Sequence, residues 1–140
     1  MTRHKRRDLW LRGISLLAIG FGLLTLREGG SVLFVDGPAR AAAGDYVPFV
    51  LWFNFLAGFA YLVAGIGLWL RRNWALWLAL AIVAATALAF AAFGLHVAFG
   101  GAFEPRTVIA MSLRTGVWAA IAAIAWWRLS AALPEAGTER

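Results

Sequence analysis

The chain has 140 residues, of which 62% are hydrophobic and 14% are charged. An ordinary soluble domain has roughly 45–50% apolar and about 25% charged residues, so this composition excludes a water-soluble domain and indicates a membrane protein. The formal net charge is +6, but the Lys and Arg residues lie at the ends of apolar runs. That placement excludes nucleic acid as a partner and leaves the lipid bilayer. The absence of cysteine excludes disulfides and thiolate metal sites.

Four apolar segments predict an all-α membrane protein, a single four-helix transmembrane domain over residues 1–140. The predicted helices cover about residues 9–27, 47–70, 74–99 and 106–129, with an outer loop at 28–46. Each approaches or exceeds the roughly 20 residues needed to cross a hydrocarbon core. Gly29 and Gly30 are predicted to end the first helix, and Asp45 to cap the second. A basic start before an apolar run is also typical of a cleaved leader, but this run is long and we expect a retained helix.

The distribution of cations predicts that both ends of the chain are cytoplasmic (N-in, C-in), because Lys and Arg accumulate on that side. This orientation implies a multi-pass membrane protein whose two ends lie in the cytoplasm. Most tryptophans lie at the same boundary, as amphipathic indoles do at headgroup level. The cations of the predicted inner side are Arg3, Lys5, Arg6, Arg7, Arg12, Arg71, Arg72, Arg128 and Arg140, and those of the outer side are Arg27, Arg40 and Arg106.

Small residues at helical spacing predict the faces on which the helices pack, since lipid gives no hydrophobic drive for helix association. A further set is predicted to stay free for a neighbouring membrane protein or a second copy. The packing sets are Ser15, Ala18, Gly22 and Thr25; Asn54, Gly58, Tyr61 and Gly65; and Ala85, Ala89, Ala92 and His96, and the free set is Ala75, Ala79, Ala119 and Ala123.

Polar side chains inside the predicted spans are the candidate ligand-binding residues. A central Arg costs about 2.5–3.5 kcal/mol to insert and needs a partner or water, which makes Arg114 the principal candidate. Asn54 is predicted at a similar depth and His96 near the outer end of the third helix, so both could meet Arg114 in the outer half, and Tyr61 and Met111 complete the predicted pocket. The alternative is structural, with Arg114 paired to a carboxylate of an outer loop.

No catalytic residue and no metal site are predicted, because every Asp and Glu falls in a tail or an outer segment. The two histidines, His4 and His96, belong to opposite sides of the predicted bundle and cannot share a haem. No enzymatic activity and no cofactor are therefore assigned from these residues.

The layout resembles the DoxX-like group of small four-helix inner-membrane proteins. The likeness lies in a glycine-bearing first helix that ends in Arg27, Gly29 and Gly30, and in a second helix with the run 64–68 that leads through Arg71 and Arg72 into an alanine-rich third. The resemblance implies a bacterial protein associated with quinone-linked or redox-stress complexes, with quinone as a ligand. It implies no catalytic residue.

Two functional hypotheses follow. The first is a non-catalytic accessory or interaction subunit of a larger membrane complex, or a homo-oligomer, because small-residue faces are abundant and a reactive constellation is absent. The alternative is a binding or transport protein for a small anionic or quinone-like molecule, reached from the outer side and anchored by Arg114.

Overall fold

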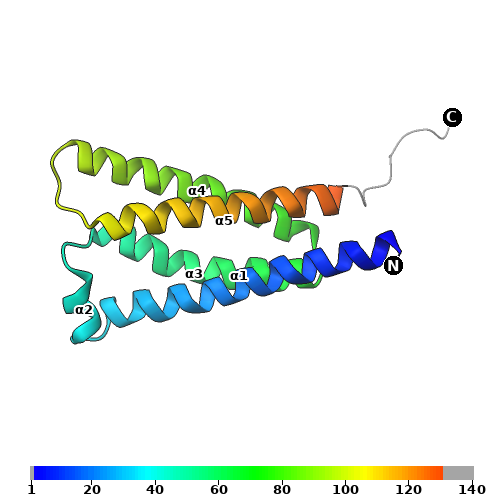
Figure 1. Cartoon of the computed structure of the whole chain (residues 1–140), viewed down its shortest axis with the longest axis horizontal. Helices are drawn as coiled ribbons and strands as arrows, with labels where there is room; N and C mark the ends of the chain where they lie inside the picture. The colour runs from blue at the N-terminus through cyan, green and yellow to red at the C-terminus, as the bar shows by residue number, and fades with distance from the viewer. Residues whose placement is uncertain (1, 131–140) are drawn as a thin grey trace.

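Residues 2–130 are described by a computed structural model, in which four long helices run alternately up and down (Figure 1). We refer to the end where α1 begins and α5 ends as the terminal end, and to the opposite end, which carries α2, as the loop end. The elements are α1 (Arg3–Leu33), α2 (Pro38–Ala43), α3 (Pro48–Trp69), α4 (Asn73–Ala98) and α5 (Pro105–Ser130).

Within the described residues, four helical segments are long and apolar enough to cross a membrane. They cover Lys5–Leu33, Pro48–Trp69, Asn73–Ala98 and Pro105–Leu129. A length of 22 residues or more spans a hydrocarbon core at the usual rise of about 1.5 Å per residue. The predicted all-α, multi-pass architecture is thereby confirmed.

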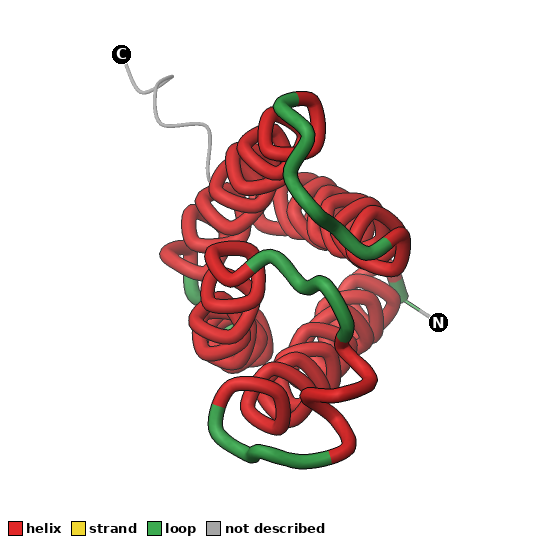
Figure 2. The backbone as a smooth tube through the Cα atoms, turned by 90° about the vertical axis from the view of Figure 1, so that its left-hand side faces the viewer, coloured by secondary structure: helices red, strands yellow, loops and turns green. Residues whose placement is uncertain are grey.

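The helices form a ring in chain order, visible from the loop end in Figure 2. α1 packs most extensively against α3, and α3 against α4 and α4 against α5 follow. The pair that closes the ring, α1 and α5, makes sparse contacts. The seam between these two helices is therefore the least packed part of the bundle.

Glycines bring α1 and α3 close together. A Cβ atom added to Gly22 would lie 3.0 Å from the Gly58 carbonyl oxygen, and one added to Gly65 would lie 2.6 Å from the Ile19 Cγ1 atom and 3.1 Å from the Ser15 carbonyl oxygen. Only residues without a side chain allow two backbones this close, as in other membrane helix pairs. The packing faces predicted on the first two spans are thus present, with Ser15, Ala18, Gly22 and Thr25 all buried.

The first helix does not end at Gly29 and Gly30. It continues to Leu33, because the helix face at Gly29 packs against Phe55 of α3, where an added Cβ would lie 3.2 Å from the Phe55 Cβ. The next residues fold into α2, whose Arg40 donates hydrogen bonds to the Val32 and Leu33 carbonyl oxygens at 2.8 and 2.7 Å. The predicted loop at 28–46 is therefore largely helical.

Asp45 does not cap α3. Val47 occupies the N-cap position, and the Asp45 backbone N–H donates to Glu104 Oε1 at 2.8 Å. This bond joins the segment before α3 to the segment before α5. The carboxylate of Glu104 therefore connects two segments at the loop end of the bundle. This contact was not predicted from the sequence.

The buried face of α4 differs from the predicted one. Ala85 and Ala92 are exposed, whereas Ala75 and Ala79 are fully buried. The tight turn at Arg71, with a φ of 57°, folds α4 back along α3, and a Cβ on Gly67 would lie 2.7 Å from the Ala75 Cβ. The prediction that Ala75 and Ala79 remain free for a neighbour was wrong, although Ala119 and Ala123 of the same set are exposed.

Candidate functional site

The candidate site lies on α5 where two hydrophobic clusters meet. Trp118 belongs to the larger cluster, which extends toward the terminal end, and Met111 belongs to the smaller cluster near the loop end. Arg114 lies between them, about one helical turn from each. A partly buried cation, with its Nε atom fully buried, therefore lies between the two apolar clusters.

Arg114 reaches across the bundle to α1. Its Nη1 donates a 2.8 Å hydrogen bond to the Thr25 Oγ1 atom, and its Cζ atom lies 5.4 Å from the centroid of the Phe21 ring. The second contact is a cation–π interaction. No carboxylate of the described residues forms an ion pair with Arg114. The alternative in which a loop carboxylate neutralises Arg114 is not what the structure shows.

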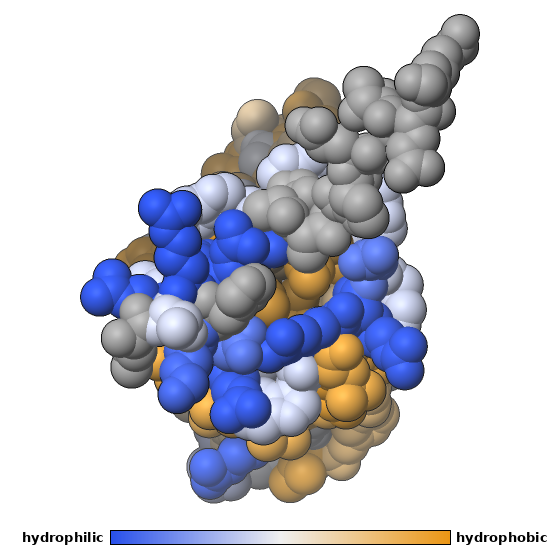
Figure 3. All heavy atoms as spheres, turned by 90° about the vertical axis from the view of Figure 1, so that its right-hand side faces the viewer, coloured by the Kyte–Doolittle hydropathy of each residue, from blue (hydrophilic) through white to orange (hydrophobic). Residues whose placement is uncertain are grey.

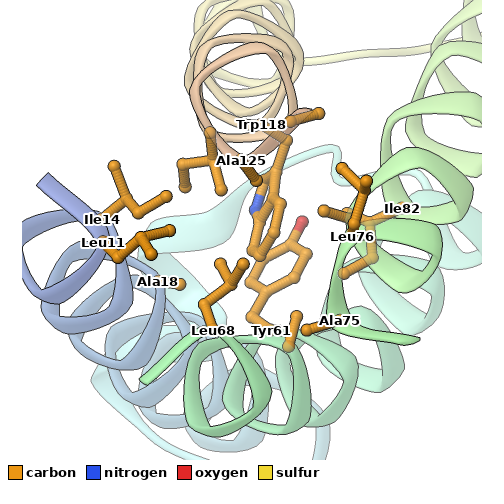
Figure 4. Close-up of a cluster of buried hydrophobic side chains, with 14 of the residues drawn as sticks. Leu11, Ile14, Ala18, Tyr61, Leu68, Ala75, Leu76, Ile82, Trp118 and Ala125 are labelled. Carbon is orange, nitrogen blue, oxygen red and sulfur yellow. The ribbon is translucent and has the colours of Figure 1, made fainter. Parts of the chain in front are cut away.

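Three further buried polar side chains lie near this arginine, namely Tyr61, Thr86 and Trp118. Together with Thr25 and Arg114 they form what we call the polar cluster. Tyr61 of α3 and Trp118 of α5 lie ring over ring at the bundle centre (Figure 4), with centroids 4.8 Å apart. The Tyr61 hydroxyl faces Arg114 and Thr86, but no hydrogen bond of normal geometry joins it to either. All three side chains are fully buried.

The polar cluster contains four buried polar atoms that have no hydrogen-bond partner among the described residues. They are Tyr61 Oη, Thr86 Oγ1, Arg114 Nε and Trp118 Nε1. A buried polar group left without a partner costs about 1–3 kcal/mol, so such groups are rare and concentrate at functional positions. The cluster offers both donors and acceptors to a molecule that enters it.

A pocket of about 330 Å³ opens at the loop end between α1, α2, α3 and α5. Its lining includes Asn54, whose Oδ1 is buried without a partner, and Ala110, which precedes Arg114 on α5 by about one turn. Glu104 and Arg106 lie at its mouth, and Arg106 donates a hydrogen bond to the Ala42 carbonyl oxygen. The pocket therefore extends along α5 from the charged loop end to about one turn before Arg114.

The structure divides the five predicted ligand-binding residues. Arg114 and Tyr61 meet in the polar cluster, whereas Asn54 lines the loop-end pocket. His96 lies apart at the end of α4, where its Nε2 is 3.0 Å from the Ala102 carbonyl oxygen and its ring meets Phe49 edge-on. Met111 is fully buried against Val47, Val50 and Phe93.

Sequence reasoning missed two members of the cluster, Thr86 and Trp118, and assigned Thr25 to packing alone. Trp118 carried a usable signal, because it lies in the middle of a span while the other tryptophans lie near span ends. Thr86 carried none, since a threonine within an apolar helix usually bonds its own backbone.

Among residues 2–130, no three His, Cys, Asp or Glu side chains are close enough to hold a metal ion. No protein-family model, curated protein or solved structure matches the chain. The function is therefore argued from the site itself.

Proposed function

We propose that this protein binds, inside the membrane, a small molecule bearing an anionic or carbonyl oxygen, with Arg114 as its anchor. The observation that carries the proposal is a partly buried cation whose hydrogen-bond partner among the described residues is the neutral hydroxyl of Thr25. A guanidinium presents several donors in a planar fork and binds a carboxylate, phosphate or carbonyl oxygen well.

Energetics favour a ligand over a purely structural role. The Thr25 hydrogen bond, worth about 1.5–3 kcal/mol, and the Phe21 cation–π contact, worth about 0.5–2 kcal/mol, together offset the insertion cost of about 2.5–3.5 kcal/mol. What remains is the cost of three buried polar atoms without a partner among the described residues, on Tyr61, Thr86 and Trp118. An oxygen-bearing ligand removes it by accepting from Arg114, Tyr61 or Trp118.

The loop-end pocket supplies the route in this proposal, since its lining descends to Asn54 and Ala110. With both termini cytoplasmic, the pocket faces the outer side of the cell inner membrane. A quinone is one molecule of the proposed class, in agreement with the resemblance to the DoxX-like group, and a small carboxylate is another. No catalytic step is part of the proposal.

The test compares wild-type protein with Arg114→Leu after extraction in mild detergent. Bound small molecules are identified by mass spectrometry, and thermal unfolding is followed with decylubiquinone and with octanoate as probes. We expect one probe to stabilise the wild type, by about 2.7 kcal/mol when its concentration is a hundred times its Kd. Arg114→Leu should remain folded and lose this stabilisation, because the leucine removes the anchor and the charge together.

The matched control is Arg106→Leu, which removes a cation at the mouth of the pocket and spares the polar cluster. It should keep most of the stabilisation. The proposal is overturned if the wild type carries no small molecule and responds to neither probe, or if Arg114→Leu responds as the wild type does.

A second candidate function, a non-catalytic interaction subunit, is favoured by one face of α4. Its residues are small and exposed, and they recur every three or four positions, so another helix backbone can approach closely. This face replaces the predicted one as the candidate contact with a membrane protein or a second copy. We call it the α4 small face; it consists of Ala84, Ala87, Ala91, Gly94 and Ala98.

A further inference from the structure

A second concave site lies at the terminal end, far from the polar cluster. Figure 3 faces this end and shows hydrophilic side chains gathered beside apolar ones. The hollow has a volume of about 310 Å³ and lies between the start of α1 and the end of α5. We call it the basic pocket; it is lined by Arg3, Arg6, Arg7, Trp10, Trp127 and Arg128.

The positive charge of the basic pocket is not neutralised by the described residues. Its described lining residues carry four guanidinium groups and no carboxylate. Among residues 2–130, Asp8 is the carboxylate at this end of the bundle, and it forms an ion pair with Arg71 at 2.5 Å. The pocket therefore attracts an anion from its surroundings.

Arg128 is held in place by aromatic rings. Its Cζ atom lies 4.3 Å from the centroid of the Trp127 ring and 5.8 Å from that of Trp10. Its buried Nε has no hydrogen-bond partner among the described residues. Cation–π contacts engage the face of a guanidinium, whereas its N–H groups are the donors that bind a phosphate oxygen.

An apolar groove continues from the basic pocket into the membrane. It has a volume of about 440 Å³ and follows the sparse seam between α1 and α5. Trp10 lines both sites. Gly13 helps to form the groove, since a Cβ at this position would meet nothing within 4 Å. The remaining lining residues are Leu9, Ile14, Leu17 and Ile124.

We propose that the basic pocket and the apolar groove together bind one anionic phospholipid, with its phosphate among the arginines and an acyl chain along Gly13. A basic pocket between transmembrane helices is the recognised setting for an acidic headgroup. Tryptophans at the same depth fit the headgroup region of a bilayer. Free phosphate would leave the apolar groove empty, whereas a phospholipid fills both sites. A lipid is therefore the occupant that the structure favours.

The test measures lipid retention by native mass spectrometry of the full chain in detergent, with dioleoylphosphatidylglycerol, dioleoylphosphatidylcholine and inorganic phosphate as separate probes. The wild type should retain one phosphatidylglycerol in preference to phosphatidylcholine. The double variant Arg3→Gln/Arg6→Gln should weaken phosphatidylglycerol binding about thirtyfold, from the usual contribution of two cations near anionic lipid. Arg72→Gln, which removes an exposed cation at the same end, is the matched control and should change little.

The groove is tested separately by Gly13→Phe, which places a ring in the groove from a position where an added Cβ meets nothing within 4 Å. This variant should weaken phosphatidylglycerol binding, while Gly116→Phe, also in open space but outside the groove, should not. The proposal is overturned if both lipids are retained equally, or if the double variant and Arg72→Gln behave alike. It is also overturned if inorganic phosphate displaces the lipid and Gly13→Phe has no effect, since the site then binds a free anion.

Discussion

The Tyr61 hydroxyl is a polar group that the folded chain keeps buried without a hydrogen bond of normal geometry. Its ring is well packed, with Phe21 on one side at 5.8 Å and Trp118 on the other at 4.8 Å between centroids. The ring thus stabilises the bundle while the oxygen atom costs free energy. Because the ring of Tyr61 stabilises the fold and its hydroxyl destabilises it, removing the hydroxyl alone tests whether this oxygen atom lacks a partner.

We predict that Tyr61→Phe raises the free energy of unfolding of the ligand-free protein by about 1 kcal/mol, because it deletes an unpartnered oxygen and keeps the ring. The same change should weaken binding of whichever molecule Arg114 anchors. Thermal unfolding in detergent measures the first effect, and probe-dependent stabilisation the second.

Tyr46→Phe serves as the control, because Tyr46 lines the loop-end pocket and is only partly buried. It should leave the stability nearly unchanged. A loss of stability in Tyr61→Phe, without any added ligand, would mean that the hydroxyl is already satisfied within the fold.

The sequence singles out an individual residue where the cost of that residue in a membrane is visible. Arg114 stood out because a charge within an apolar span is expensive wherever it points. His96 was placed with it on depth alone, and depth does not determine the direction of a side chain around the helix axis. The rotation of α4 and the turn after it direct His96 toward Ala102 instead.

At the scale of elements, the spans were predictable and their contacts less so. Apolar length fixes where a helix crosses a bilayer, and all four predicted spans are helical. The extension of α1 beyond Gly29 depends on Phe55, a residue of another helix. Glycine was taken as a stop signal, but in a membrane it equally marks close packing between helices.

The α4 small face yields a prediction for the interaction hypothesis. Ala87→Phe should abolish association with a partner helix or second copy and leave the fold intact, since Ala87 is exposed and a bulky ring blocks only a close approach from outside. Native mass spectrometry after gentle extraction reports the assembly state.

Leu88→Phe is the matched control, because Leu88 is 72% exposed and already large. Its assembly state should equal that of the wild type. Ala79→Phe, by contrast, should destabilise the monomer, as Ala79 is fully buried. Equal assembly of Ala87→Phe and the wild type would exclude this face as the contact.

At the scale of the whole molecule, two arginines join α5 to α1. Arg114 contacts Thr25 and Phe21 toward the loop end, and Arg128 contacts Trp10 at the terminal end. Between these two points the seam is open as the apolar groove. Polar and cation–π contacts thus add to the apolar core that α1 and α5 share, and both proposed binding sites lie along this seam.

The orientation of the molecule is a prediction from charge alone, and it determines which side of the membrane each site faces. The cations at the start of α1, in the α3–α4 turn and at the end of α5 predict a cytoplasmic terminal end.

Because the chain lacks cysteine, single cysteines report one position each. We expect an impermeant thiol reagent on intact cells to label Ala43→Cys and Ala102→Cys, which lie at the loop end. Thr2→Cys and Asn73→Cys at the terminal end should react only after lysis, as should Thr138→Cys, which lies outside the described residues. Labelling of Asn73→Cys in intact cells would show that the predicted orientation is wrong. With the reverse orientation, the proposed ligand would enter from the cytoplasm.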